Sequence, residues 1–441
     1  MNGGMKNIVI IGGGFGGIRV ARDLGKHDKY LKSKGYEVLV IDRVRHHLYT
    51  PLLYEVASGC MIEKGMRMES ELLSGVSFRL DEISKSCCGV GSLQGEIVGV
   101  DFNLKKVKLA SGTEVPYEYL VIAAGAETDY FGIPGLKQNS HAMKTRADAL
   151  ALRQRIQDFI EAKKRGEEVQ IQIMVGGGGA TGVEFSAEMA GCFRRLARAG
   201  EIKNGDWSLT LVEASPRVLG MLPKRASDIT LRRLERLGVK VLRDTCVKRA
   251  EEKHVVLAPR PLKAGESPET LVCEFRTEFE KIFEVDVLVW TGGVRASSLS
   301  EKAGLPVDRK GRIQTDESLR IHTRPDVFAV GDCAAPVDPQ TKNTVPQLAQ
   351  AALKEGELAA KNIIHHIRRE PLEMFGFPSY PTVIPLGAKN SILVMKGFIV
   401  NGFLGWLVRQ AADLRYFFSV LPFWSAIRVF VTGARLYTRN D

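Results

Sequence analysis

The chain has 441 residues, of which 44% are hydrophobic and 26% charged, and its formal net charge is +11. This composition excludes a disordered chain, and the length allows two or three domains with sizeable cores. The positive charge suits polyanionic cofactors or anionic lipid, while no basic motif with interleaved aromatic residues indicates nucleic acid. The seven cysteines include no Cys-x-x-Cys pair, so we expect no metal site and a reducing compartment.

The first predicted element is a buried parallel strand over residues 6–11, and no signal-like segment precedes it. We therefore expect the mature chain to start here, in the cytoplasm. The strand breaks into Gly12-x-Gly14-x-x-Gly17, and a helix starts near Ile18. In this spacing the first glycine makes the turn, the second admits a pyrophosphate, and the third lets helix and strand pack closely. Asp42 ends the next strand and is placed to bind a ribose.

The same pattern recurs in the second third of the chain. A strand over residues 170–175 leads into Gly177-x-Gly179-x-x-Gly182, and a helix extends to about residue 198. The next strand ends on Glu213, whose carboxylate would hold a ribose diol and repel a 2′-phosphate. Glu213 thus favours NADH over NADPH, whereas Arg217, four residues later, acts against this preference. The sequence therefore predicts two dinucleotide-binding units.

After the second unit the chain is predicted to return to the first domain. The buried strand that ends at Gly331-Asp332 and a helix over about 346–368 indicate this return. The expected fold class is α/β, with two Rossmann-type domains of which the first is interrupted by the second. The domains we expect are 1–142 and 296–392 for the discontinuous one, 143–295 for the inserted one, and 393–441 for a C-terminal region.

The C-terminal region is aromatic and apolar, with arginines at intervals. Its uncharged stretch 416–427 has 12 residues and contains Pro422, whereas a spanning helix needs about 20 apolar residues. We interpret the region as an amphipathic membrane anchor that lies in the lipid interface, with its arginines toward anionic lipid. The alternative is a helical hairpin packed on the body or on a dimer partner. The arginines are Arg409, Arg415, Arg428, Arg435 and Arg439.

Several segments resemble known families. Residues 8–17, 119–125, 177–184 and 328–332 look like the two-dinucleotide flavoprotein oxidoreductases. The segment Tyr-Thr-Pro-Leu-Leu-Tyr-Glu-Val-Ala-Ser-Gly that starts at Tyr49, together with the tail, resembles the type II NADH dehydrogenases. The resemblance covers nearly the whole chain. It implies FAD in the first domain, NADH in the second, and a membrane quinone as the electron acceptor of a non-pumping peripheral enzyme on the cytoplasmic side of the cell membrane.

The resemblance also implies roles for single residues. Asp332 would bind the flavin ribityl chain, and Glu184 would lie near the nicotinamide and act in hydride geometry and proton handling. The alternative for Glu184 is a structural acid that the helix dipole favours. The full set of cofactor-binding candidates is Gly12, Gly14, Phe15, Gly16, Gly17, Asp42, Arg43, Thr50, Pro51, Ala124, Gly125, Gly177, Gly179, Ala180, Thr181, Gly182, Glu184, Glu213, Gly292, Gly293, Gly331, Asp332, Gln347, Leu348 and Ala349.

The quinone segment of the family reads Ala-Gln-x-Ala-x-Gln, and here it departs from that pattern. Aligned on Pro346-Gln347, the chain has Pro in place of the leading Ala, and Gln350 comes one position early. We assign Gln347 to the quinone and Gln350 as a substitute, since residues three apart on a helix have nearby faces. The alternative for Gln350 is a solvent-exposed helix residue that has no role in quinone binding.

Two rival functions remain open at this point. One is a sulfide:quinone oxidoreductase-like flavoenzyme, with Cys192 and Cys333 in place of the cysteine pair that such enzymes use beside the flavin. The other is a non-catalytic NADH-binding flavoprotein that senses redox state. The vicinal Cys87-Cys88 is interpreted as incidental, and a homodimer is left open. We also expect that truncation after Gly397 releases the protein from membranes and preserves NADH-to-ferricyanide activity.

Overall fold

The first predicted strand lies inside the largest sheet of the protein. The computed structural model describes residues 5–59, 70, 72–86, 89–266, 280–377 and 380–437. Strand β1 (Lys6–Ile11) buries its last four residues, as expected of a parallel strand covered on both faces. It pairs in parallel with a strand on each side. The six strands, in spatial order, are β20 (Arg320–Ile321), β21 (Arg324–Ala329), β9 (Tyr119–Ile122), β1, β2 (Tyr36–Asp42) and β5 (Val90–Gln94).

The second sheet is the core of the inserted domain. All of its strand pairs are parallel, and its order places the glycine-loop strand in the middle. The five strands, in spatial order, are β11 (His141–Ala142), β18 (Val287–Trp290), β12 (Ile171–Gly176), β13 (Trp207–Val212) and β14 (Val239–Leu242). Because β9 precedes this sheet in the chain and β21 follows it, yet both pair in the first sheet, the first domain is discontinuous.

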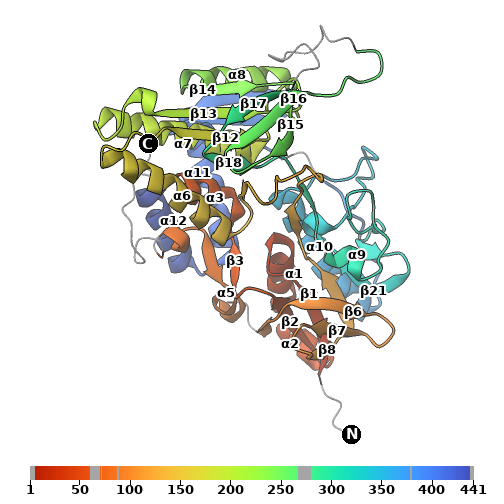
Figure 1. The fold of residues 1–441 in the computed structure, drawn as a ribbon. Helices are drawn as coiled ribbons and strands as arrows, with labels where there is room; N and C mark the ends of the chain where they lie inside the picture. The colour runs from red at the N-terminus through yellow and green to blue at the C-terminus, as the bar shows by residue number, and fades with distance from the viewer. Residues whose placement is uncertain are drawn as a thin grey trace.

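Long helices cover the two sheets. Helices α1 (Phe15–Gly25) and α10 (Ala349–Arg368) touch at their backbones, because a Cβ on Gly356 would lie only 2.6 Å from the carbonyl oxygen of Gly16. The second sheet is associated with α6 (Arg146–Lys164), α7 (Ala180–Arg198) and α8 (Lys224–Arg236). Figure 1 shows the first sheet and α1 at one end of the molecule and the second sheet with α8 at the other.

Smaller elements surround these layers. The strands β10 (Ala126–Thr128) and β19 (Val294–Ala296) pair where the chain enters and leaves the inserted domain. The short helices are α2 (Asp28–Ser33), α3 (Leu53–Ser58), α5 (Leu80–Ser86) and α9 (Leu299–Lys302). The other small sheets are β3 (His46–Leu48) with β4 (Ser77–Arg79), β6 (Ile97–Asp101) with β7 (Lys106–Leu109) and β8 (Glu114–Pro116), and β15 (Thr245–Ala250) with β16 (His254–Pro259) and β17 (Lys281–Glu284).

The C-terminal region folds onto the body of the protein. Strands β22 (Thr382–Pro385), β23 (Ser391–Met395) and β24 (Phe398–Gly402) form a sheet that the sequence did not predict. Helices α11 (Phe403–Val420) and α12 (Phe423–Tyr437) then form a hairpin, which lies near α3 and α6 in Figure 1. None of the described helices is long and apolar enough to cross a membrane.

Two expectations about the C-terminal third are wrong. Arg409 does not face lipid: its side chain is 9% exposed and its guanidinium pairs with Asp413, because this face of α11 packs on the protein. Helix α10 begins at Ala349 rather than near Pro346, since the backbone of its N-cap residue Leu348 is still extended. Gln347 therefore precedes the helix and shares no helical face with Gln350. The hairpin packs on the body, as the alternative for the tail expects, and membrane association of its outer face stays a prediction.

Candidate functional site

The first glycine loop has the geometry of a phosphate cradle. Gly12 has φ of +100°, and a Cβ there would lie 2.3 Å from the Ala123 carbonyl oxygen. A Cβ on Gly17 would lie 1.9 Å from the Gly12 carbonyl oxygen, so neither position tolerates a side chain. Gly14 differs, because no described atom lies within 4 Å of its Cβ position. No side chain caps the start of α1, so its first N–H groups can bind an anion.

Asp42 lies at the end of β2, where the sequence places it. Its Oδ2 accepts the backbone N–H of Gly13 at 2.6 Å, and its Oδ1 accepts that of Val44 at 2.9 Å. The acid thus orders the glycine loop, and each oxygen keeps further acceptor capacity for a ribose hydroxyl. The next residue, Arg43, is exposed.

The second loop repeats this construction. Gly177 has φ of +108°, and a Cβ on Gly182 would lie 1.9 Å from the Gly177 carbonyl oxygen. The Cβ position of Gly179 is open within 4 Å in the described part of the chain, and no side chain caps α7, which Ala180 and Thr181 begin. Glu213 accepts the N–H groups of Gly178 and Ser215, each at 2.6 Å. A backbone of this shape fits a second dinucleotide.

The remaining cofactor candidates gather at the carboxyl ends of parallel strands. Ala124-Gly125 follows β9, Gly331-Asp332 follows β21, and Gly292-Gly293 follows β18 in the second domain. Ligands of open α/β sheets bind at this edge. The Asp332 carboxylate lies 3.6 Å from the Lys144 ammonium. Asp332 also lines a small surface depression together with Gly331, Gln347, Leu348 and Glu355.

Glu355 is a buried acid that the sequence did not single out. Its carboxyl oxygen Oε2 accepts the backbone N–H of Gly331 at 2.5 Å, so it supports the turn that presents Asp332. Burial raises the pKa of Glu355 to about 8. The signal available in the sequence was weak, since a lone acid in a helix is ordinarily solvated.

A network of buried polar side chains joins the hairpin to the first domain. The Tyr49 hydroxyl donates to Asp413 Oδ1 at 2.5 Å, and Arg409 Nε donates to Asp413 Oδ2 at 2.9 Å. Arg409 Nη2 also donates to the carbonyl oxygen of Pro51 at 3.0 Å. Thr50 and Pro51, both cofactor candidates, form the 3-10 turn η1 (Thr50–Leu52). The turn expected near the flavin is therefore held by α11.

His47 makes a second link between the same two parts. Its Nδ1 lies 2.8 Å from the carbonyl oxygen of Gly13, and its Nε2 lies 2.6 Å from the Tyr416 hydroxyl. Burial lowers the pKa of His47 to about 4, so the imidazole is neutral. The rings of Tyr49 and Tyr416 stack at 4.6 Å between centroids.

Glu184 lies where the inserted domain meets the hairpin. It occupies the first turns of α7 and is 8% exposed. Burial raises its pKa to about 7; Arg409 acts to lower it, and Asp413 acts to raise it. A carboxyl with this pKa exchanges a proton near neutral pH, as a group that handles protons must. The structural alternative, an acid near the start of α7 that the helix dipole stabilises, stays open.

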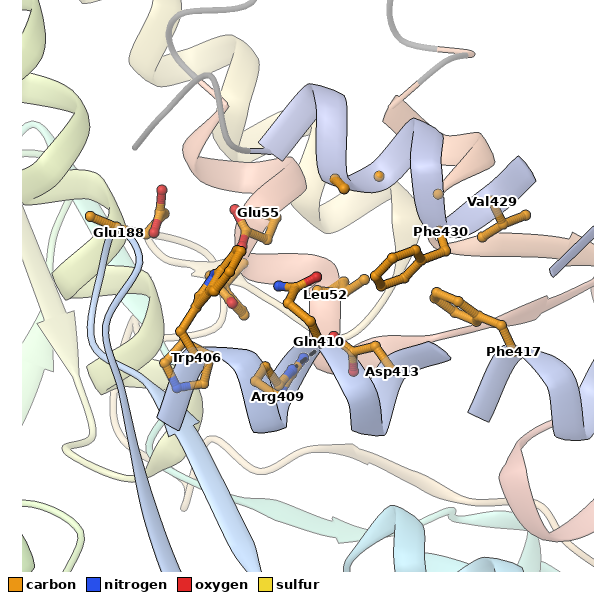
Figure 2. Close-up of a pocket in the computed structure, with 16 residues that line it drawn as sticks. Leu52, Glu55, Glu188, Trp406, Arg409, Gln410, Asp413, Phe417, Val429 and Phe430 are labelled. Atoms are coloured by element: carbon orange, nitrogen blue, oxygen red, sulfur yellow. Dashed lines mark hydrogen bonds and ion pairs between the residues drawn. The ribbon is translucent and has the colours of Figure 1, made fainter. Parts of the chain in front are cut away.

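A cavity opens between the two helices of the hairpin. It holds about 610 Å³ of empty space, part of it open to solvent. In Figure 2, Arg409, Gln410 and Asp413 line it from α11, while Val429 and Phe430 line it from α12. Leu52, Tyr54, Glu55 and Glu188 close the side toward the body. Polar side chains therefore line the cavity from α11 and the body, and apolar side chains line it from α12.

Comparison with known proteins agrees with this geometry. Residues 6–356 match the pyridine nucleotide-disulphide oxidoreductase family. The chain is 31% identical to the type II NADH:quinone oxidoreductase of Haemophilus influenzae, covering 87% of this chain and 85% of that protein. The chain belongs to the type II NADH:quinone oxidoreductases. The enzyme of that name from Staphylococcus saprophyticus is 27% identical, with 94% of this chain and 96% of that protein covered.

Solved structures show the same fold. NDH2 from Plasmodium falciparum in complex with NADH has a TM-score of 0.79 at 19% identity and covers 98% of each chain. The sulfide:quinone oxidoreductase of Aquifex aeolicus has a TM-score of 0.73 at 17% identity, covering 96% of this chain and 92% of that one. These likenesses concern the fold alone.

The cysteines considered for sulfide chemistry are not brought together. Cys192 is buried in α7 and is disulfide-bonded, contrary to the expectation of reduced cysteines, whereas Cys333 is a free thiol in a separate core of the first domain. The Cys333 thiol lies 3.4 Å from the carbonyl oxygen of Ile122, and burial raises its pKa to about 12. Such a thiol is a poor nucleophile. Cys87-Cys88 lies outside the described residues.

Proposed function

We propose that this type II NADH:quinone oxidoreductase binds NADH at the β12–α7 loop and receives quinone from the side of the C-terminal hairpin. The observation that carries the proposal is the position of Glu184. It comes from the NADH-domain helix, yet its electrostatic partners Arg409 and Asp413 belong to the hairpin. The NADH side and the expected quinone side therefore meet at the carboxyl group of Glu184.

FAD and NADH fit the two loops. Each loop offers uncapped helix N–H groups, an open glycine, and an acid placed for a ribose. When bound, FAD supplies the two-electron chemistry, taking hydride from NADH and returning electrons to the acceptor. The chain orients both dinucleotides, and Glu184 holds or releases a proton at its carboxyl. We propose NADH as the preferred donor, since the Glu213 carboxylate lies where a 2′-phosphate would be repelled.

The start of α10 changes the alignment of the quinone segment. Counted from Ala349, the chain reads Ala349-Gln350-x-Ala352, which matches the first four positions of the family pattern, but Lys354 stands in place of the second glutamine. Gln350 is exposed on the first turn, and its amide reaches the Pro381 carbonyl oxygen at 3.4 Å. Gln347 donates to the Asp332 carbonyl oxygen at 2.8 Å. We propose that Gln350 contacts quinone, whereas Gln347 orders the flavin turn.

The outer face of the hairpin is proposed to lie on anionic lipid at the cytoplasmic side of the membrane. Large apolar side chains are exposed along both helices, which is unusual for a face turned to water. Arg415, Arg428 and Arg435 are exposed on the same hairpin and would meet lipid phosphates. The exposed apolar residues are Phe403, Leu404, Leu407, Val408, Phe418, Phe423, Trp424 and Val431.

Stopped-flow spectroscopy of the flavin-loaded protein tests the function. NADH should bleach the flavin within milliseconds to seconds, and a membrane quinone should restore its colour in catalytic turnover. Gln350→Ala should raise the KM for quinone at least about tenfold and leave bleaching by NADH unchanged. Fast bleaching without turnover on any quinone in a panel would instead support a redox sensor. Bleaching by sulfide but not by NADH would reject the proposal.

A further inference from the structure

We propose that His47 is a positioning residue that couples docking of the C-terminal hairpin to FAD binding. Its imidazole lies between the phosphate-binding loop of the first domain and Tyr416 of α11. The proposal goes beyond electron transfer, because it concerns the affinity of the protein for FAD and the contacts that set this affinity.

The hydrogen-bond chain has a defined direction. The Gly13 carbonyl oxygen can only accept, so Nδ1 of His47 must carry the proton and donate to it. A neutral imidazole then has a bare Nε2, which accepts from the Tyr416 hydroxyl at 2.6 Å. His47 and Tyr416 are both buried, with His47 at 0% exposure, so water cannot replace either partner. Loss of one partner leaves the other unsatisfied.

The Gly13 peptide is held from both sides. Its N–H donates to Asp42 Oδ2 at 2.6 Å, and its carbonyl accepts from His47. Gly13 stands between Gly12, with φ of +100°, and Gly14, the N-cap of α1. The bonds to Gly13 therefore set the direction of the N–H groups that receive a pyrophosphate.

The hairpin also touches the loop directly. Phe15, the first residue of α1, packs its ring against Tyr416 at 5.3 Å and edge-on against His47 at 5.2 Å between centroids. The glycine loop is thus in contact with α11 through a ring cluster and through a hydrogen-bond chain. When the hairpin is docked, the loop is preorganised for the cofactor, and by linkage bound FAD must favour the docked hairpin by the same factor.

Two conservative substitutions test the link. Tyr416→Phe removes only the hydroxyl that donates to His47. His47→Asn retains an amide near the Nδ1 position, able to donate to Gly13, but loses Nε2. Each should raise the Kd of the apoprotein for FAD by about tenfold, measured by flavin fluorescence quenching. The double variant should be no weaker than either single one, because both break the same contact.

Tyr117→Phe is the matched control, since the Tyr117 hydroxyl is buried and has no hydrogen-bond partner among the described residues. It should leave the Kd for FAD within twofold. Hydrogen exchange supplies a second measurement: FAD should slow exchange of the α11 amides in the wild type, and less so in Tyr416→Phe. If Tyr416→Phe binds FAD as tightly as Tyr117→Phe does, or if FAD leaves α11 exchange unchanged, the coupling does not exist.

Discussion

Replacement of Glu184 by glutamine tests the role of the carboxyl between the donor and acceptor sides. Burial raises the pKa of Glu184 from 4.5 to about 7, so the ionised form is disfavoured by about 3 kcal/mol relative to water. Below pH 7 the carboxyl is mainly protonated, and above it mainly ionised. A step that needs one of these forms must therefore show an apparent pKa near 7 in the wild type.

The charged residues of the hairpin determine in which direction the pKa of Glu184 should shift when they are replaced. Asp413 acts to raise the pKa of Glu184, so Asp413→Asn should shift the profile to lower pH by about one unit. The asparagine oxygen can still accept from Tyr49, which limits structural damage. Arg409→Lys keeps the positive charge that lowers the pKa of Glu184 and should leave the midpoint in place.

The assay is stopped-flow measurement of flavin reduction by NADH and reoxidation by quinone between pH 5.5 and 8.5. Glu184→Gln should abolish the ionisation near pH 7 in at least one of these steps. Stability gives an independent readout. The folded pKa is raised, so the wild type loses stability as pH rises from about 4.5 to about 7, and Glu184→Gln should be more stable than the wild type at pH 8.5 by up to about 3 kcal/mol. An unchanged profile in Glu184→Gln, or an alkaline shift in Asp413→Asn, would refute the reasoning.

Three further predictions concern the loops and the hairpin. Gly179→Val should keep the thermal unfolding midpoint, because no described atom lies within 4 Å of its Cβ, and should raise the KM for NADH at least about tenfold if a pyrophosphate occupies that space. Glu213→Gln should reduce the NADH-to-NADPH ratio of kcat/KM about tenfold, and an unchanged ratio would contradict the ribose assignment. Trp424→Glu should weaken sedimentation with anionic vesicles, whereas Met221→Glu, at an equally exposed site on the inserted domain, should not. If Trp424→Glu instead splits a dimer seen by analytical ultracentrifugation, the hairpin face binds a second copy.

The dinucleotide loops could be predicted from the sequence because their signals are local. A strand, a glycine turn and a helix start occupy about a dozen consecutive residues, and Gly12 and Gly17 are required by contacts within that stretch. Asp42 and Glu213 follow from the same rule at the end of the next strand. The interrupted first domain also followed from strand order, which parallel pairing of β9 with β21 confirms.

The hairpin network could not be predicted in this way, because its partners are far apart in the chain. Tyr49 meets Asp413 across 364 positions, and His47 meets Tyr416 across 369. One signal was present: Asp413 is the only acidic residue between residues 398 and 437, and it lies four positions after Arg409. A carboxylate on a lipid-facing helix is costly, so this pair favours an inward face.

The two faces of α11 decide whether the hairpin is a separable anchor. One face exposes Phe403, Leu404 and Leu407, while the other buries Arg409 and Asp413. To leave the body, the helix would have to expose a paired charge and leave the Tyr49 and His47 side chains without their partners, each at a cost of about 1–3 kcal/mol. The hairpin therefore packs as part of the flavin domain, and the effect of truncation after Gly397 on flavin chemistry stays a prediction to be measured. If the exposed face rests on lipid as proposed, this helix also fixes the orientation of the η1 turn and the glycine loop relative to the membrane.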